Sequence, residues 1–395
     1  MCTSANVSPV PAPSRRQFIK FAGACAAAAA GMGLAGCSNG HGDSASQASS
    51  KAAPTVEDRT LTGDTDPTTV RVGLIMGPPS MGLSRFLIDA QSGDTYNSYE
   101  FEFCGVDYQA VAARLNQGDF DIVTLPSNLG AVLYNNEDIK TKVQAISVNN
   151  LGVLYGITTD PNVNELADLE GRTAYVYGEG GTPEYTIATV LEGHGLGDGK
   201  VNIVFKSTPF EVLNLLQDEE NCIAILPQPF VALADTMVTG LRHPIDITAE
   251  GESMESMESA NGSEAVTTHT VANREFLEEH ELAVVEYLQR AGASVDWTLK
   301  NLDEASSCQV ELGSFLNDDV ARQAMPYISL VNLTGEVMYD ALSGFLAAIH
   351  AQNPDSIGGD MPGSDFYYMP PAGALDADVQ AMASAPDKTP AELVG

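Results

Sequence analysis

Short apolar segments alternate with amphipathic stretches along most of the chain, and this rhythm predicts alternating strands and helices. Buried parallel strands are continuous apolar runs, and the segments here fit that description. In a first α/β unit the pattern predicts strands over 70–76, 99–104, 120–125 and 143–148, with helices over 81–90, 108–117 and 128–134. Another apolar strand is predicted over 151–158, and Asp160-Pro161 breaks it.

The rhythm then restarts in a second unit. It predicts strands over 172–177, 201–205, 223–226 and 241–247, and helices over 182–193, 210–217 and 230–238. Two successive α/β units imply two lobes. We expect residues 70–155 and 265–369 to form lobe one and residues 156–264 to form lobe two. Long amphipathic helices over 274–300, 318–325 and 335–351 belong to lobe one.

The first 36 residues have the pattern of an export signal. Arg15 and Arg16 precede an Ala/Gly-rich apolar stretch over 21–36, which resembles a twin-arginine signal. The sequence Leu-Ala-Gly-Cys that ends at Cys37 resembles a bacterial lipobox, which predicts cleavage before Cys37 and a lipid on its thiol. The stretch is short of the roughly 20 residues that span a membrane. A plain N-terminal anchor helix is the alternative interpretation.

Polar segments flank the predicted lobes. Residues 37–69 begin with Ser, Gly, Ala and Gln, and we expect a flexible tether that carries the lipid. Lipid and tether together predict an extracytoplasmic protein anchored to the bacterial cell membrane by Cys37. Residues 370–395 are predicted to be a disordered tail.

The charge of the chain excludes one class of partner. There are 19 Lys and Arg against 53 Asp and Glu, a formal net charge of −34, and cleavage before Cys37 would make it −37. A surface this acidic repels phosphate backbones, so we expect no nucleic-acid binding. Electrostatic docking on anionic membrane surfaces is disfavoured for the same reason.

No catalytic or metal-binding motif stands out in the sequence. The six histidines show no HExxH spacing, and the chain has no GxSxG elbow and no P-loop. We therefore expect no catalytic residue, no metal and no cofactor, and a protein that is not an enzyme. Cys104 and Cys222 lie in apolar runs typical of buried positions, while a disulfide that involves Cys308 stays open.

Four junctions between a strand and a helix have unusual turn chemistry, at residues 77–82, 126–128, 178–184 and 226–230. Open α/β sheets bind ligands at such junctions, beyond the carboxyl ends of the strands. Ser80, Ser127 and Thr182 fit helix N-caps, with Pro183 at the first helical position. A helix N-terminus binds an anion or a polar acceptor. One such turn is ordinary, but two from each lobe indicate a ligand cleft between the lobes.

The ordered motifs at residues 77–82, 121–129, 151–155, 180–185, 225–230 and 343–346 carry a family resemblance. They resemble extracytoplasmic solute-binding lipoproteins of ABC importers, of the nitrate, sulfonate and taurine (NMT1/THI5-like) type. The resemblance implies an α/β, type II periplasmic-binding-protein fold, in which two hinged lobes close on a small-molecule solute. A monomer is expected to dock on ABC permease subunits. We expect the hinge in the crossing strands near 148–158 and 247–267.

The resemblance also assigns ten residues to the ligand cleft. Hydroxyl, amide and backbone N–H groups would bind the solute, whereas Glu184 would support a helix start and Tyr155 would either stack on a planar ligand or pack as core. The ten residues are Ser80, Met81, Ser127, Asn128, Asn150, Tyr155, Gly181, Thr182, Glu184 and Gln228. The solute stays open between a sulfonate, nitrate and a neutral or cationic heterocycle.

Two other functions are compatible with the same fold. The protein could be a ligand sensor that reports to a membrane receptor, which sequence does not separate from transport. It could also be an enzyme similar to those that make a thiamine precursor or act in the menaquinone pathway. Those enzymes work in the cytoplasm, and the cysteine-rich motif of the thiamine-precursor synthases is missing here.

Overall fold

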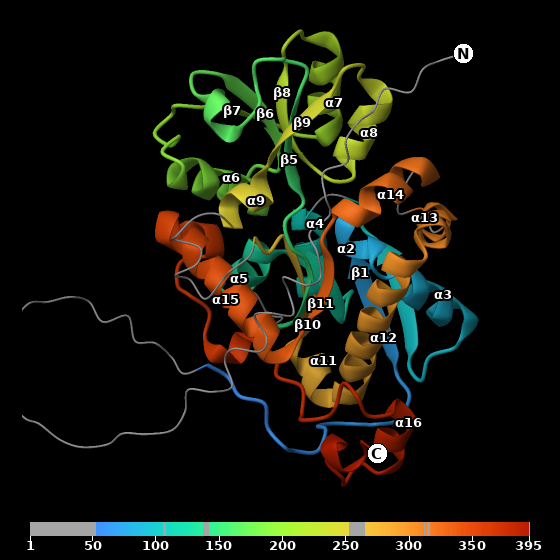
Figure 1. Cartoon of the computed structure of the whole chain (residues 1–395). Helices are drawn as coiled ribbons and strands as arrows, with labels where there is room; N and C mark the ends of the chain where they lie inside the picture. The colour runs from blue at the N-terminus through green and yellow to red at the C-terminus, as the bar shows by residue number, and fades with distance from the viewer. Residues whose placement is uncertain are drawn as a thin grey trace, which may run out of the picture. The chain divides into compact units, whose positions relative to one another are not determined.

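Two mixed β-sheets organise the part of the chain that the structure describes (Figure 1). The structure is a computed structural model, and it describes residues 53–105, 108–136, 142–252, 265–311, 313 and 317–394. The predicted export signal, the lipobox with Cys37 and the first part of the predicted tether lie outside these residues. None of the described helices is both long enough and apolar enough to cross a membrane.

The first sheet has six strands in the order β11-β4-β10-β3-β1-β2. β1 is parallel to β2 and β3, whereas β10 is antiparallel to β3 and β4. All five residues of β3 are buried, as its continuous apolar sequence predicts. The strands are β1 (Thr69–Leu74), β2 (Ser98–Phe103), β3 (Ile122–Pro126), β4 (Val143–Asn150), β10 (Thr268–Asn273) and β11 (Leu330–Leu333).

Helices cover both faces of the first sheet. One apolar cluster joins the sheet to α4 (Tyr108–Gln117), α5 (Ser127–Asn135) and α15 (Gly335–Gln352). A second cluster joins it to α3 (Ser84–Ser92) and α12 (Glu281–Lys300), where the rings of Phe86 and Tyr287 lie 5.6 Å apart. The other helical elements of this region are α2 (Pro78–Met81), α11 (Arg274–Glu279), α13 (Leu302–Glu311), α14 (Asp318–Ala324) and the 3₁₀ turn η3 (Met325–Tyr327).

The second sheet has five strands in the order β7-β6-β8-β5-β9. β6 is parallel to β7 and β8, and β5 is antiparallel to β8 and β9. α6 packs in one apolar cluster with the sheet, and α7 and α8 pack in another. The elements are β5 (Leu154–Thr158), η2 (Leu166–Leu169), β6 (Thr173–Tyr177), α6 (Thr182–Gly193), β7 (Asn202–Lys206), α7 (Pro209–Asp218), β8 (Ile223–Pro227), α8 (Phe230–Met237), β9 (Arg242–Asp246) and α9 (Ile247–Glu252).

The border between the predicted lobes needs a correction at β5. The sequence analysis places it between residues 155 and 156, which is inside this strand. All five residues of β5 pair with β8 in the second sheet, beginning with Leu154 opposite Pro227. The apolar run over 151–158 does not reveal this, because nothing within it marks the residue at which pairing with the second sheet begins.

Two stretches of chain connect the sheets, one between β4 and β5 and the other between β9 and β10. The backbone N–H of Thr267 donates to the Asn150 carbonyl at 3.0 Å, and its hydroxyl donates to the Leu151 carbonyl at 2.7 Å. A Cβ on Gly152 would lie 1.7 Å from the Thr248 hydroxyl oxygen, so only glycine fits there. The two connections are therefore tightly packed on each other, within the segments where the sequence analysis expects the hinge.

The single long helix predicted over 274–300 is interrupted. His280 leaves the helical conformation, with φ −140° and ψ 49°, so that α11 ends before it and α12 begins after it. His280 instead forms an isolated antiparallel bridge with Gly63. A tertiary contact from the distant N-terminal segment thus overrides the local helical pattern.

The predicted disordered tail is wrong. Residues 370–394 are described and pack on α12, with Ala374, Ala377 and Met382 buried against Leu282 and Val285. The short apolar side chains that make this contact are spread through a Pro- and Ala-rich segment, which hides them from the composition. The elements of the last part of the chain are η4 (Pro354–Ile357), η5 (Ser364–Phe366), α16 (Val379–Ser384) and η6 (Pro390–Glu392).

The second half of the predicted tether is also ordered. The buried carboxylate of Glu281 accepts hydrogen bonds from the Arg59 guanidinium at 2.6 and 2.8 Å and from the Thr62 N–H at 2.6 Å. The Ala372 N–H donates to the Glu57 carbonyl at 2.9 Å, so the two ends of the described chain run together beside α12 (Figure 1). A buried carboxylate needs such partners, and the N-terminal segment supplies them.

The three described cysteines are free thiols. Cys222 and Cys308 are buried and Cys104 is half-buried. Burial raises the pKa of the Cys222 thiol to about 12 and that of Cys308 to about 11, so both are protonated at neutral pH. No disulfide links these three residues.

Candidate ligand site between the two sheets

Asn128, the second residue of α5 on the first sheet, contacts the start of α6 on the second sheet. Its amide nitrogen donates to the Gly180 carbonyl at 3.3 Å and to the Ser356 carbonyl at 3.2 Å. Its amide oxygen accepts from the Thr182 hydroxyl at 3.2 Å. Asn128 and Thr182 are nearly fully buried. The structure therefore brings together two predicted site residues from different sheets.

The start of α6 is held by an internal carboxylate. The Gly180 N–H donates to the Glu184 carboxylate at 2.6 Å, which agrees with the supporting role expected for Glu184. Gly181, which is buried, is the N-cap residue, whereas Thr182 and Pro183 are the first two helical residues. The prediction of Thr182 as N-cap is wrong by one residue, because its hydroxyl bonds to Asn128 rather than to its own helix.

Tyr155 makes a second contact between the sheets. Its ring packs with the second sheet's core, and its hydroxyl donates to the Tyr327 carbonyl at 3.1 Å. Burial and the nearby Asp246 carboxylate raise the pKa of Tyr155. We call the contacts of Asn128, Gly180 and Thr182, together with that of Tyr155 and Tyr327, the seam.

Ser127 lies beside the seam but bonds elsewhere. Its hydroxyl donates to the Val266 carbonyl at 2.6 Å and its N–H donates to the Thr267 carbonyl at 3.2 Å. It is the first residue of α5, after the N-cap Pro126, so the N-cap prediction is wrong. Ser127 thereby attaches α5 to one of the two connections between the sheets.

Ser80, Met81 and Asn150 form a separate group. Ser80 lies inside α2 and not at its N-cap, and its hydroxyl donates to the Gly77 carbonyl at 3.0 Å. Met81 is fully buried in an apolar cluster. The Asn150 amide donates to the Ile328 carbonyl at 3.0 Å and accepts from the Thr268 hydroxyl at 2.8 Å. These polar groups are satisfied inside the first sheet's region, and no seam bond involves them.

Gln228, at the end of β8, also has internal partners. Its side-chain oxygen accepts from the Ala232 N–H at 3.2 Å, and its own N–H donates to the Val153 carbonyl at 2.9 Å. The side chain therefore satisfies the first turn of α8, which begins at Phe230. The backbone bond ties this junction to the connection between β4 and β5.

A small, largely apolar pocket lies where α6 and α9 meet α15. It is lined by Thr186, Thr189 and Val190 of α6, Ile247, Thr248 and Gly251 of α9, Ala265, and Phe345, Ala348 and Ile349 of α15. Thr186 is one helical turn beyond Thr182, so the pocket continues the contact region along α6. Sequence reasoning did not find these residues, because it searched turns and these lie mainly on helices.

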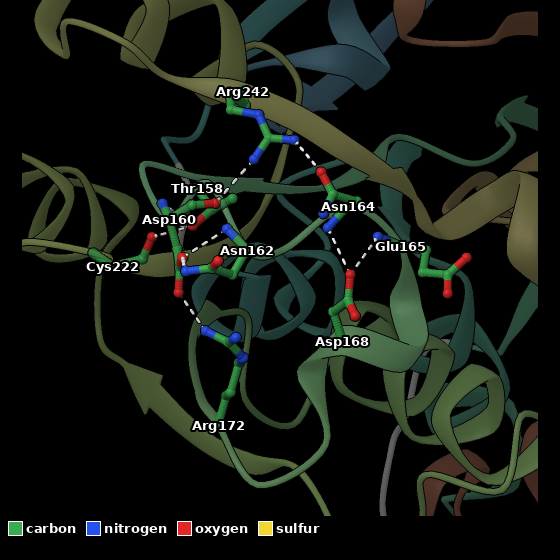
Figure 2. A network of polar contacts seen from close by, with 9 residues as sticks. All are labelled: Thr158, Asp160, Asn162, Asn164, Glu165, Asp168, Arg172, Cys222 and Arg242. Atoms are coloured by element: carbon green, nitrogen blue, oxygen red, sulfur yellow. Dashed lines mark hydrogen bonds and ion pairs between the residues drawn. The ribbon is translucent and has the colours of Figure 1, made fainter.

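Within the second sheet's region, a different polar network surrounds Asp160 (Figure 2). The Asp160 carboxylate accepts from the Asn162 N–H at 2.8 Å and from the Arg172 guanidinium. Arg242 donates to the Asp160 carbonyl at 3.0 Å and to the Asn164 side chain at 2.7 Å. The Asn162 N–H and Arg172 hold the pKa of Asp160 below its usual value. We call these residues the Asp160 network.

Sequence comparisons bear on the N-terminus alone. Residues 12–32 match the model of the twin-arginine translocation pathway signal sequence. No curated protein matches the chain in sequence. The export signal expected from Arg15 and Arg16 is therefore confirmed as twin-arginine type.

Solved structures match about three quarters of the chain. An ABC transporter protein from Parabacteroides distasonis is similar with a TM-score of 0.62 and 20% identity, over 76% of this chain and 98% of that one. The periplasmic aliphatic sulphonate binding protein SsuA of Escherichia coli is similar with a TM-score of 0.60 and 12% identity, over 77% of this chain and 94% of that one. The alkanesulfonate-binding protein SsuA of Xanthomonas axonopodis is similar with a TM-score of 0.55 and 11% identity, over 76% of this chain and 96% of that one.

The chain has the periplasmic-binding-protein fold. The predicted fold class, two α/β lobes, is thereby confirmed. We call the first sheet with its helices lobe 1, and β5 to α9 (residues 154–252) lobe 2. The hydrogen bonds of the seam join lobe 1 to lobe 2. Within the described ranges, no group of three or more His, Cys, Asp or Glu side chains is placed to hold a metal ion.

Proposed function

We propose that this protein is the solute-binding component of an ABC importer. It captures a small polar or heterocyclic solute between its lobes by hinge closure and delivers the solute to permease subunits. The protein acts as a monomer and performs no catalysis. The fold of the solved relatives and the twin-arginine signal support this proposal.

One observation carries the proposal, namely the pair of bonds that Asn128 makes across the seam. They connect the carboxyl end of β3 in lobe 1 with the turn after β6 in lobe 2, where open α/β sheets bind ligands. Amide and hydroxyl groups that bond to each other in a closed form can bond to a solute after opening. A ligand that contacts both lobes favours the closed form and shifts the population towards it.

We also propose how the protein is held at the cell membrane, outside the cytoplasm. Twin-arginine export followed by cleavage before Cys37 would leave a lipid on the Cys37 thiol, joined to lobe 1 by the residues up to Glu57. A single chain of lipid binds a membrane only weakly, so a bacterial lipoprotein with more than one acyl chain is the form expected to stay anchored.

The solute is found by unfolding the full chain in the presence of sulfonates, nitrate, pyrimidines, amino acids and aromatic acids. A solute at about 100 times its Kd adds roughly 2.7 kcal/mol to the free energy of unfolding, which raises Tm by a few degrees. Asn128→Ala should weaken that solute's binding about tenfold, since it removes two hydrogen bonds of the site. Asn202→Ala, at an exposed position of the edge strand β7 in lobe 2, is the matched control and should leave Kd unchanged.

The proposal fails if no solute shifts Tm, or if Asn128→Ala and Asn202→Ala bind a solute that does shift it with the same Kd. Anchoring is tested separately, by expressing wild type and Cys37→Ala with a radioactive fatty acid. Wild type should carry the label and sediment with membranes, and the variant should do neither. A labelled variant would contradict the lipid site without affecting the solute-binding proposal.

A further inference from the structure

The charges at the seam indicate which solutes it accepts. No lysine or arginine side chain takes part in the described bonds of the seam. The seven arginines described in lobe 1 all form ion pairs with acids of lobe 1. In lobe 2, Arg172 and Arg242 belong to the Asp160 network. An anion that entered the seam would meet no opposite charge from these side chains.

The acidic side chains near the seam disfavour an anion there. Glu184 lies two residues after Thr182, with its carboxylate 2.6 Å from the Gly180 nitrogen. Asp246 pairs across β5 and β9 with Tyr155, and its carboxylate accepts from the Thr248 N–H at 3.0 Å. Asp246 is half-buried, and its burial raises the pKa of its carboxyl. The formal charge of the whole chain, −34, adds a field of the same sign.

One backbone donor at the turn before α6 is already occupied. Helix N-termini bind anions through free N–H groups. At α6 the Glu184 carboxylate already accepts from Gly180, so a second carboxylate or a sulfonate would compete with it and be repelled. The crossing bonds of the seam join neutral donors, the Asn128 amide and the hydroxyls of Thr182 and Tyr155, to neutral acceptors. These acceptors are the Asn128 amide oxygen and the carbonyl oxygens of Gly180 and Tyr327, so a solute with hydrogen-bond donors finds partners there.

We infer that the seam selects against anions and takes a solute that bears hydrogen-bond donors and no negative charge. This inference rests on the proposed function, because it assigns a ligand class to the same site. It sets this protein apart from relatives of the same fold whose names specify sulfonates. Glu184 is the specificity-determining residue, through its charge rather than through contact with the solute.

The test measures the electrostatic potential at the seam without knowledge of the solute. Thr182→Cys places a thiol there in the full chain, and the thiol is modified with methanethiosulfonates that carry trimethylammonium or sulfonate groups. Peptide mass spectrometry separates this thiol from the native cysteines, and rates are divided by those of a small free thiol. We expect the cationic reagent to react about tenfold faster than the anionic one at low salt, and less so at high salt.

Glu184→Gln in the Thr182→Cys background should bring the ratio several-fold closer to one. Glu192→Gln is the matched control, since it removes the same charge from an exposed position of α6 two turns away and should leave the ratio unchanged. A ratio at or below one, or equal ratios for the two variants, overturns the inference. If Thr182→Cys does not fold, Asn128→Cys supplies the thiol.

The result also separates this inference from the proposed function. A seam thiol that reacts with neither reagent would mean that no solute reaches the seam, which overturns both. A thiol that reacts faster with the anionic reagent overturns the charge selection alone, and the search for an anionic solute then follows.

Discussion

The seam and the Asp160 network are both polar clusters, but they are built from different chemistry. The seam uses amide, hydroxyl and carbonyl groups, with single bonds of 3.1 to 3.3 Å between the lobes. The Asp160 network uses a carboxylate and two guanidinium groups, all inside lobe 2, with bonds such as 2.8 Å from Asn162 (Figure 2). One cluster crosses between lobes and the other does not.

The difference follows from what each cluster has to do. A buried charge that loses its partner costs several kcal/mol, so charged networks suit places that never open. Neutral hydrogen bonds contribute about 1 kcal/mol each, because water or a solute replaces the lost partner. Neutral groups at the seam therefore permit opening, while charged groups fix the loop after β5 in lobe 2.

The largest expected effect concerns a buried histidine that packs against α5 and stays uncharged at neutral pH. His269 of β10 is fully buried against α5, since a Cβ on Gly130 would lie 1.9 Å from its ring nitrogen. Burial lowers the pKa of His269 to about 3. The folded pKa is below the unfolded one, so stability is complete above about pH 6.5 and is lost as the pH falls towards 3.

His269→Leu should remove the loss of stability that protonation of His269 causes at low pH. At pH 4 the histidine costs wild type about 3 kcal/mol of unfolding free energy relative to pH 8, and urea titrations at the two pH values measure the difference. His269→Gln, which keeps a polar side chain without titrating, should lose the pH dependence as well. Equal pH dependence in wild type and both variants would show that His269 is not the group that titrates.

The next effect tests the charged network. Asp160→Ala removes a carboxylate that accepts from Asn162 and Arg172, and should lower the free energy of unfolding by about 2 kcal/mol in urea. Glu220→Ala, at an exposed acid of lobe 2, should change it by less than about 0.5 kcal/mol. The balance between open and closed lobes should be the same in both variants. A changed balance in Asp160→Ala alone would break the distinction between the two clusters.

Asn128→Ala, unlike Asp160→Ala, should change the balance between open and closed lobes. It removes the crossing bonds to Gly180 and Thr182, so the closed form should lose about 1 kcal/mol, or about fivefold in its population ratio. Spin labels at the exposed positions of Phe210→Cys and Val337→Cys, one in each lobe, report the interlobe distance. Cys104→Ser removes the half-buried native thiol. An unchanged distance distribution would mean that Asn128 does not hold the lobes together.

The smallest effect isolates one bond of the seam. Thr182→Val keeps the shape of the side chain and loses only the hydroxyl that donates to Asn128. We expect a shift of about 0.5 kcal/mol, roughly twofold, in the same spin-label distances. Thr173→Val, at a half-buried position in β6, serves as the control for the chemical change. A larger shift for Thr182→Val than for Asn128→Ala would contradict the assignment of the seam to Asn128.

The candidate site was partly predictable. The family resemblance assigned Asn128, Gly181 and Thr182 to the cleft; the structure bonds Asn128 to Thr182 at the seam, with Gly181 as the adjacent N-cap. Turn chemistry at the strand ends placed Ser80 and Ser127 as N-caps, where the structure has them inside helices with hydroxyls bonded to carbonyls. A hydroxyl finds the nearest acceptor in three dimensions, and a local pattern cannot specify an acceptor as distant in sequence as Val266.

The sequence by itself determined the export signal, the two successive α/β units and the apolar strands, because these depend on local periodicity and on neighbouring residues. Only the tertiary structure decided that β5 belongs to lobe 2, that His280 interrupts a helix and that the chain ends pack beside α12. Each of these depends on partners far apart in sequence, such as Arg59 with Glu281. The free energy of such contacts depends on burial and geometry, which form only when the chain folds.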